Sequence, residues 1–277
     1  MKHYIGAKKP WQQKSDGTAE KMDEKRLPCY NHPTGVDPMN YVMSDLHGCL
    51  KEYRQALRAI RFSDADTLYV LGDVIDRGPD SVGLLRDMML RPNVIPLIGN
   101  HEYMALRVLR RLCVEITAET AERYLRPDDL TAYAHWCADG GDKTAAQFRA
   151  LARKEQEELL DYLEEFSLYE TVRAGGRDYV LVHAGLEPFD PDQPLEDYHL
   201  AEMIFRAPDY DRVYFPNRVL VTGQTPTAAL GAAHRGKIVQ QNNHIAIDCG
   251  CVFGMALGVY CLDTGETWYI PAQTAEK

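Results

Sequence analysis

The sequence predicts an α/β (α+β) protein in which two mixed β-sheets form a central sandwich flanked by helices. Between residues 40 and 112, short apolar runs alternate with segments whose apolar residues recur at helical spacing. Residues 113–165 are rich in Ala, Glu, Arg and Leu, and residues 168–270 return to short apolar runs. Strand–helix alternation followed by strands within one chain is typical of mixed sheets with covering helices.

The first part of the chain is predicted to run β-α-β-α-β-α. Apolar residues at Leu50, Tyr53, Leu57 and Ile60 repeat at the period of a helix. Pro79 suits the first turn of the second helix, where its missing N–H costs nothing. The elements expected here are strands over 41–43, 67–71 and 94–98 and helices over 50–60, 79–90 and about 102–112.

The remainder is expected to complete a single domain over residues 39–271. Residues 113–165 are predicted to form a helical insertion beside the active face, with breaks near Arg126-Pro127 and Asp139-Gly140-Gly141. Residues 1–38 are polar and lack a sustained period, so we expect an irregular N-terminal extension. The later strands are expected over 168–173, 179–182, 219–221, 238–240, 245–247, 256–262 and 267–270.

The composition narrows the class of protein. A net charge of −10 over 277 residues argues against a nucleic-acid-binding surface, which needs clustered Lys and Arg. No run of 18 apolar residues predicts a membrane span, and the N-terminus lacks the apolar stretch of a secretory signal. Seven scattered cysteines suit reduced thiols better than a disulfide framework. We therefore expect a cytoplasmic protein without a membrane partner.

Six polar segments each close a short apolar run. They are Ser44-Asp45-Leu46-His47-Gly48, Gly72-Asp73-Val74-Ile75-Asp76-Arg77-Gly78, Gly99-Asn100-His101-Glu102, His183-Ala184-Gly185, Thr222-Gly223-Gln224-Thr225-Pro226 and Asp248-Cys249-Gly250. Ligands of open α/β sheets collect beyond the carboxyl ends of the strands, so side chains in these segments are expected to converge. Two carboxylates, two imidazoles and an amide oxygen suit a pair of divalent cations. Asp248 is expected to shape the pocket floor without a chemical role.

Each segment alone has an ordinary explanation. A lone Asp-x-His is usually a turn with a capping Asp, and Gly-Asn-His is a good turn sequence. The first four in order, however, are difficult to explain as turns. Their ordered set resembles the phosphoprotein phosphatase family of metallophosphoesterases, which has the calcineurin-like fold, and within it the bacterial and phage branch of Ser/Thr protein phosphatases. The resemblance covers about residues 40–262, with Ser44 in place of a Gly and Ile75 in place of a Val.

The resemblance implies a two-metal centre. Asp45 and His47 would hold the first metal, Asp73 would bridge, and Asn100 and His183 would hold the second. A metal-bridging hydroxide would then attack phosphorus in line. Two divalent ions are therefore the expected cofactors, with Mn favoured and Fe or Zn as alternatives.

The resemblance also implies the groups that handle the phosphate and the proton. His101 would be the general acid, and Asp76 would orient its imidazole. Arg77 would clamp the non-bridging phosphate oxygens with its fork of N–H donors. Arg206 lies where the bacterial branch places a second phosphate-binding arginine, although an ordinary surface charge is the alternative.

The fifth segment departs from the family pattern, which has a metal-binding histidine where this chain has Gln224. Gln224 would be a weaker ligand that shifts preference toward Mn or Mg. Alternatively, His234 or His244 would substitute, or the second metal would bind poorly. Because the predicted acid and both arginines are present, we favour a retained enzyme with an altered second metal site.

The sequence leaves the substrate open among three alternatives. The leading hypothesis is a Ser/Thr protein phosphatase acting on a phosphorylated protein. The alternative is a symmetrical dinucleoside polyphosphate hydrolase, for which Tyr133 and Trp136 could form a lid over a nucleotide base, although helix packing is favoured for both. The third is a catalytically weak protein that binds phospho-ligands.

Overall fold

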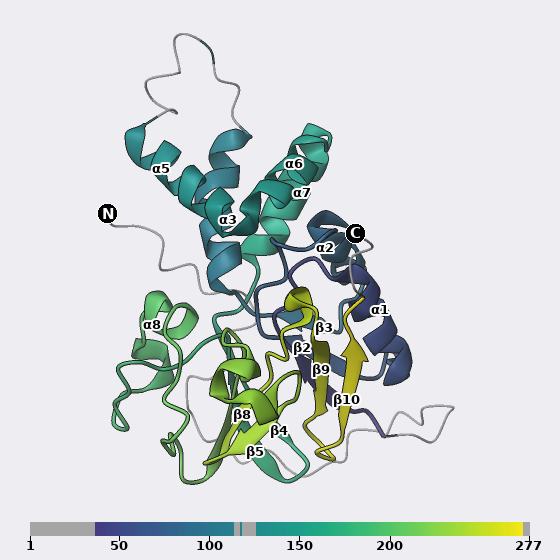
Figure 1. Ribbon diagram of the computed structural model, residues 1–277, viewed down its shortest axis with the longest axis vertical. Coiled ribbons are helices and arrows are strands. Elements are labelled where there is room, and N and C mark those ends of the chain that lie inside the picture. The colour runs from purple at the N-terminus through teal and green to yellow at the C-terminus, as the bar shows by residue number, and fades with distance from the viewer. Residues whose placement is uncertain (1–36, 114–116, 118–125, 274–277) are drawn as a thin grey trace, which may run out of the picture. The chain divides into compact units, whose positions relative to one another are not determined.

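The computed structural model describes residues 37–113, 117 and 126–273, and its centre is a pair of five-stranded mixed sheets (Figure 1). The first sheet has the order β10-β9-β1-β2-β3. Its strands β1, β2 and β3 are parallel, whereas β9 and β10 are antiparallel to their neighbours. The bounds are β1 Asn40–Met43, β2 Thr67–Val70, β3 Val94–Pro96, β9 Ala256–Cys261 and β10 Thr267–Pro271.

The second sheet has the order β4-β5-β6-β8-β7. Here β5, β6 and β8 are parallel, and β4 and β7 are antiparallel edge strands. The bounds are β4 Tyr169–Ala174, β5 Arg177–Val182, β6 Arg218–Thr222, β7 Val239–Gln241 and β8 His244–Ala246. The predicted fold class is therefore confirmed.

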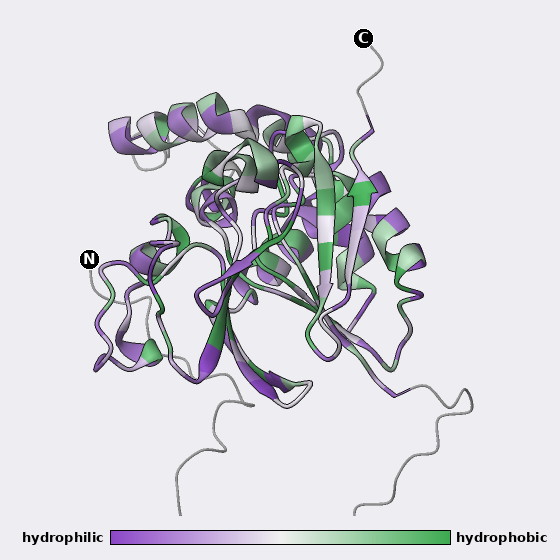
Figure 2. Cartoon of the chain, turned by 60° about the horizontal axis from the view of Figure 1, so that its bottom comes forward, coloured by the Kyte–Doolittle hydropathy of each residue, from purple (hydrophilic) through white to green (hydrophobic). Residues whose placement is uncertain are grey.

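The central strands are apolar on both faces because both of their faces are covered, whereas the edge strands β4 and β7 carry exposed polar residues. On β1, Val42 joins an apolar cluster that also contains Leu181 and Val221 of the second sheet, so this cluster fills the layer between the sheets. Tyr41 and Met43 point the other way, into the cluster shared with the helices. Figure 2 shows apolar residues along the central strands and a mixture of hydrophilic and apolar residues along the flanking helices.

The helices follow the predicted order with shifted ends. Asp80 caps the second helix by accepting a hydrogen bond from Gly83 N at 2.8 Å, so this helix starts after Pro79. The third helix starts at Asn100, and a short helix α8 was not predicted. The bounds are α1 Leu50–Ala59, α2 Ser81–Met89, α3 Asn100–Leu112, α5 Pro127–Trp136, α6 Asp142–Arg149, α7 Arg153–Glu164 and α8 Leu200–Ile204.

The segment predicted to be a helical insertion contains α5, α6 and α7 in its described part, and the chain kinks between α5 and α6 at Gly140, whose φ is 99°. Residues 114–116 and 118–125 of this segment lie outside the described residues, as do residues 1–36 of the predicted N-terminal extension. We retain the single domain over residues 39–271 as a proposal. Among the described helices, none has the length and apolar character that a membrane crossing requires.

Candidate metal centre

The six polar segments all follow parallel strands. Three come after β1, β2 and β3 of the first sheet, and three come after β5, β6 and β8 of the second. Parallel strands end at the same edge of a sheet, so each sheet delivers three loops to one place. The metal ligands expected from the sequence lie together there, and they are Asp45, His47, Asp73, Asn100, His183 and Gln224.

The backbone in these loops adopts conformations that non-glycine residues rarely adopt. Six site residues have positive φ angles between 42° and 74°, and they are Asp45, His47, Asp73, Asp76, Arg77 and Gln224. Strained backbone of this kind costs on the order of 1–3 kcal/mol per residue and concentrates at functional sites. Close packing also explains Gly223, since a Cβ there would collide with the side chains of Ser44 and Asp45. Gln224 therefore shares the local geometry of the other site residues.

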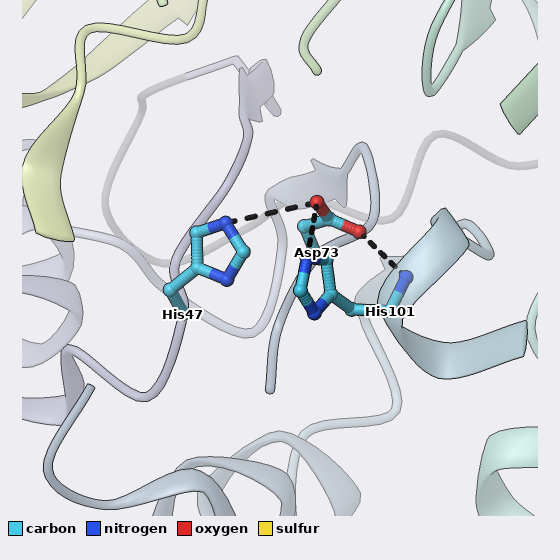
Figure 3. A group of neighbouring side chains, drawn as sticks. All are labelled: His47, Asp73 and His101. Carbon is cyan, nitrogen blue, oxygen red and sulfur yellow. Dashed lines mark hydrogen bonds and ion pairs between the residues drawn. The ribbon is translucent and has the colours of Figure 1, made fainter. Parts of the chain in front are cut away.

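Asp73 is at the centre of the cluster. One of its oxygens lies 3.6 Å from His47 Nε2 and 3.9 Å from His101 Nε2, and Figure 3 shows this carboxylate between the two rings. The other oxygen lies 3.4 Å from His183 Nε2 and accepts the backbone N–H of His101 at 3.1 Å. The ligand atoms of Asp45, Asp73 and His183 lie within 4.8 Å of one another, as do those of His47, Asp73 and His101. A carboxylate shared by both groups is what a bridging ligand requires.

A second set of donors surrounds His183. Its Nε2 lies 3.0 Å from Asn100 Oδ1 and 2.6 Å from Gln224 Oε1. The same end of the Asn100 amide lies 2.7 Å from Gln224 Oε1 and 3.1 Å from the nearer oxygen of Asp73. The Asn100 oxygen thus faces only acceptors, an arrangement that a cation between these lone pairs would relieve.

Two predicted histidine ligands are oriented by backbone carbonyls. His47 Nδ1 lies 2.9 Å from the carbonyl of Ile75, and His183 Nδ1 lies 2.6 Å from that of Leu71. A carbonyl only accepts, so each Nδ1 carries the proton and each Nε2 presents a lone pair to the cluster. Burial lowers the pKa of His47 to about 4, which keeps its imidazole neutral at pH 7, as metal binding requires.

The cluster holds more negative charge than its surroundings neutralise. Burial, together with Asp248 and Asp73, raises the pKa of Asp45 well above its usual value. Burial and the charge of Asp73 raise the pKa values of both Glu102 and Asp248 to about 7. Divalent cations would supply the missing positive charge. The donor set, its tautomers and its charge therefore fit two divalent metal ions.

The predicted acid, His101, contacts Asp76 as expected, and Asp76 is itself held by Trp136, a contact that the sequence did not reveal. His101 Nδ1 lies 2.8 Å from Asp76 Oδ2, which also accepts the indole N–H of Trp136 at 2.6 Å. His101 Nε2 is buried and has no hydrogen-bond partner in the structure. Burial by itself lowers the pKa of His101, but the bond to Asp76 and the charge of Asp73 outweigh it and raise the pKa. Trp136 is 0% exposed, so it packs in the core and does not form a lid.

Arg77 lies at the edge of the cluster, next to an acidic residue that sequence analysis assigned only to a helix break. Arg77 Nη1 lies 2.9 Å from His47 Nε2, and its Nη2 donates to Asp139 Oδ1 at 2.7 Å. The other Asp139 oxygen lies 3.5 Å from His101 Nε2. The kinked segment Cys137–Gly141 thus places the Asp139 carboxylate against both the predicted phosphate arginine and the predicted acid. Nothing in the sequence pattern marks this approach.

Arg206 reaches the site only through its backbone. A Cβ at Gly185 would lie 2.7 Å from the Arg206 carbonyl oxygen, which places Arg206 beside the His183 loop. The Arg206 side chain is exposed and takes part in no hydrogen bond or ion pair found among the described residues. Its phosphate-binding role remains a prediction.

Glu102 is a further supporting residue whose function the motif alone did not reveal. It is fully buried and accepts hydrogen bonds from Asp73 N and Val74 N, both at 2.8 Å, and from Gly99 N at 2.9 Å. Ile75 N donates a fourth at 3.2 Å. One carboxylate thus fixes the backbone that carries the central ligand.

The two histidines considered as substitutes for Gln224 have other surroundings. His244 Nε2 lies 2.8 Å from the hydroxyl oxygen of Thr222, and its ring stacks on Tyr210 with centroids 5.0 Å apart. His234 ends a short 3-10 turn and belongs to no ligand group found among the described residues. Of the three residues, Gln224 is the one whose side chain lies beside a predicted ligand, His183.

Comparisons with known proteins agree with this geometry. Residues 41–247 match the family model of calcineurin-like phosphoesterases. A candidate diadenosine tetraphosphatase of known structure superimposes with a TM-score of 0.61 at 19% identity, covering 87% of this chain and 96% of that one. A protein serine/threonine phosphatase from Saccharomyces cerevisiae gives a TM-score of 0.52 at 15% identity, covering 88% of this chain and 83% of that one. These two likenesses concern the fold alone.

Two relatives with similar sequences have the same name. A symmetrical bis(5'-nucleosyl)-tetraphosphatase from Acidovorax sp. strain JS42 is 33% identical over 150 residues, which are 53% of this chain and 44% of the relative. One from Xylella fastidiosa strain M23 is 28% identical over 176 residues, 62% of this chain and 51% of the relative. The chain thus matches about half the length of these relatives. From the family model, the fold and the clustered ligands together, the chain belongs to the calcineurin-like phosphoesterase family.

Proposed function

We propose that this protein is a metal-dependent hydrolase that cleaves dinucleoside tetraphosphates symmetrically. The observation that carries the proposal is the similarity to proteins named symmetrical bis(5'-nucleosyl)-tetraphosphatases, together with a ligand cluster of the kind that phosphoester hydrolysis uses. This reverses the order of the two leading substrate hypotheses drawn from the sequence. The protein phosphatase hypothesis drew on general features of the catalytic motifs, which phosphoesterases with different substrates share.

Different residues of the site perform different steps of the proposed reaction. When bound, two divalent ions supply Lewis acidity and an activated water at the cluster. Arg77 neutralises the non-bridging oxygens of the phosphate under attack. His101 donates the proton on Nε2 to the leaving oxygen, and Asp76 holds the imidazole so that this nitrogen faces the cluster. Asp73 and its neighbours hold the ions in place.

The test uses the full-length protein with Mn²⁺ and diadenosine tetraphosphate, with the nucleotides separated by chromatography. Symmetrical cleavage gives two molecules of ADP, whereas asymmetrical cleavage gives ATP and AMP. A phosphopeptide assayed in parallel measures protein phosphatase activity, and Asp73→Asn serves as the inactive control. ATP and AMP as products, or phosphate release from the phosphopeptide alone, would refute the proposal.

A further inference from the structure

A large aromatic side chain is left exposed beside the metal centre. Phe253 ends the 3-10 turn Cys251–Phe253, shortly after Asp248, and is 53% exposed. The guanidinium carbon of Arg77 lies 5.8 Å from the centre of its ring. An aromatic ring with one face toward a phosphate-binding arginine and much of its surface open to solvent is suited to bind a flat ligand.

The turn that carries Phe253 is held firmly in place. Gly250 N donates to Asp248 Oδ1 at 2.8 Å, and its carbonyl accepts from Phe253 N at 3.1 Å and from Met255 N at 3.2 Å. Gly250 has a φ of 74°, and a Cβ there would collide with the Met255 side chain. The backbone that carries the ring is therefore ordered before any ligand arrives, which reduces the entropy lost on binding.

The order of the groups in space matches the order of the groups in a nucleotide. His47 belongs to the metal cluster, Arg77 Nη1 lies 2.9 Å from its Nε2, and the Phe253 ring centre lies 5.8 Å from the same guanidinium. A phosphate chain that starts at the metals and passes Arg77 brings its nucleoside toward Phe253. The two aromatic residues considered from the sequence are less suitable. Trp136 is buried, and Tyr133 is partly buried and packs edge-on against Trp136 with ring centroids 6.3 Å apart.

We propose that Phe253 stacks on one purine base of the dinucleotide substrate and thereby determines the preference for nucleotides over base-free phosphates. This inference rests on the proposed function, because it names the part of the molecule that receives a base of the substrate. Stacking on an aromatic side chain tolerates either purine, since every base presents a π-face. Arg77 completes the subsite by neutralising the adjoining phosphate.

The experiment compares the full-length protein with Phe253→Ala, Phe253→Trp and the control Tyr269→Ala, all with Mn²⁺. Tyr269 is a matched aromatic residue, 41% exposed on β10. Steady-state kinetics are measured with diadenosine tetraphosphate, and calorimetry measures the binding of ADP and of pyrophosphate. Phe253→Ala is expected to raise KM for the dinucleotide and Kd for ADP about tenfold, with kcat and Kd for pyrophosphate within about twofold. Phe253→Trp and Tyr269→Ala are expected to match the wild type.

Two results would overturn the stacking proposal. One is an unchanged Kd for ADP in Phe253→Ala. The other is an equal loss of ADP and pyrophosphate binding, which would show that the substitution displaced Arg77 instead of removing a base contact. Failure of the proposed function is seen separately, as a wild-type protein that produces no ADP from diadenosine tetraphosphate. The comparison of ADP with pyrophosphate then still decides whether Phe253 holds a base.

Discussion

Gln224 Oε1 lies 2.6 Å from His183 Nε2, and the backbone N–H of Gln224 donates to Asp45 Oδ2 at 3.0 Å. A residue that replaces the family's histidine thus points its side-chain oxygen at the same cluster of lone pairs. The amide oxygen is a harder and weaker donor than imidazole. We propose that Gln224 completes the set of ligands and changes the metal that the set prefers.

Replacing Gln224 by histidine should tighten the second metal site. We expect Gln224→His to bind Zn²⁺ about tenfold more tightly and to shift the preference away from Mn²⁺, because imidazole suits Zn better than an amide does. Metal titration followed by elemental analysis measures the change. Gln240→His, at an exposed position of strand β7, controls for an added surface histidine. Unchanged metal content and unchanged hydrolysis in Gln224→His would show that Gln224 is not a ligand.

Removing the proposed general acid, His101, should lower kcat most for substrates whose leaving group needs a proton. His101→Asn is expected to lower kcat for diadenosine tetraphosphate by about 100- to 10,000-fold, because the proton for the leaving oxygen is lost. The loss should be much smaller for 4-nitrophenyl phosphate, whose leaving group needs no proton. His234→Asn, in a turn outside the ligand groups, is the control and should retain full activity. Equal losses on both substrates would argue against a general-acid role.

Truncating Glu102 should destabilise the protein. Glu102→Ala leaves four backbone N–H groups without their acceptor in a buried loop, so we expect a loss of about 3 kcal/mol or more in the free energy of unfolding. Urea denaturation of the metal-free protein measures it. Glu155→Ala is the matched control, because Glu155 stands at the same position of helix α7 but its side chain is 45% exposed, and the loss should stay below about 1 kcal/mol. A similar loss of unfolding free energy in both variants would show that the hydrogen bonds of Glu102 do not stabilise the loop.

His244 should make the stability of the fold depend on pH. Burial lowers the pKa of His244 to about 4, below the value of about 6.5 for an unfolded chain. The unfolded state therefore binds more protons between these values. The stabilising contribution is complete above pH 6.5 and is lost as the pH falls toward 4.

The contribution of His244 to the pH dependence of stability can be measured by comparison with His244→Phe, which lacks the imidazole. The wild type should lose about 2 kcal/mol more than His244→Phe between pH 8 and pH 5, since one pKa unit corresponds to about 1.4 kcal/mol. Urea denaturation at both pH values gives the two differences. Parallel pH profiles of the wild type and the variant would contradict the assignment.

Most of the architecture could be predicted from the sequence because the signals are local. The strand before Asp45 and the helix from Leu50 follow from the spacing of apolar residues over a few positions. The start of helix α3 was placed two residues too late, because Asn100 and His101 were taken as a loop whereas they form its first turn. The short helix α8 was missed, since five residues give too little periodicity to detect.

By itself, the sequence determined the fold class and the identity of the clustered side chains, because each motif combines a strand, a tight turn and a donor within a few residues. Only the tertiary structure decided which groups meet across the chain. Trp136 reaches Asp76 over 60 positions, and Gln224 reaches Asp45 over 179. It also decided that Trp136 is buried while Phe253 is exposed. Such contacts depend on how distant elements pack together, which local spacing does not specify.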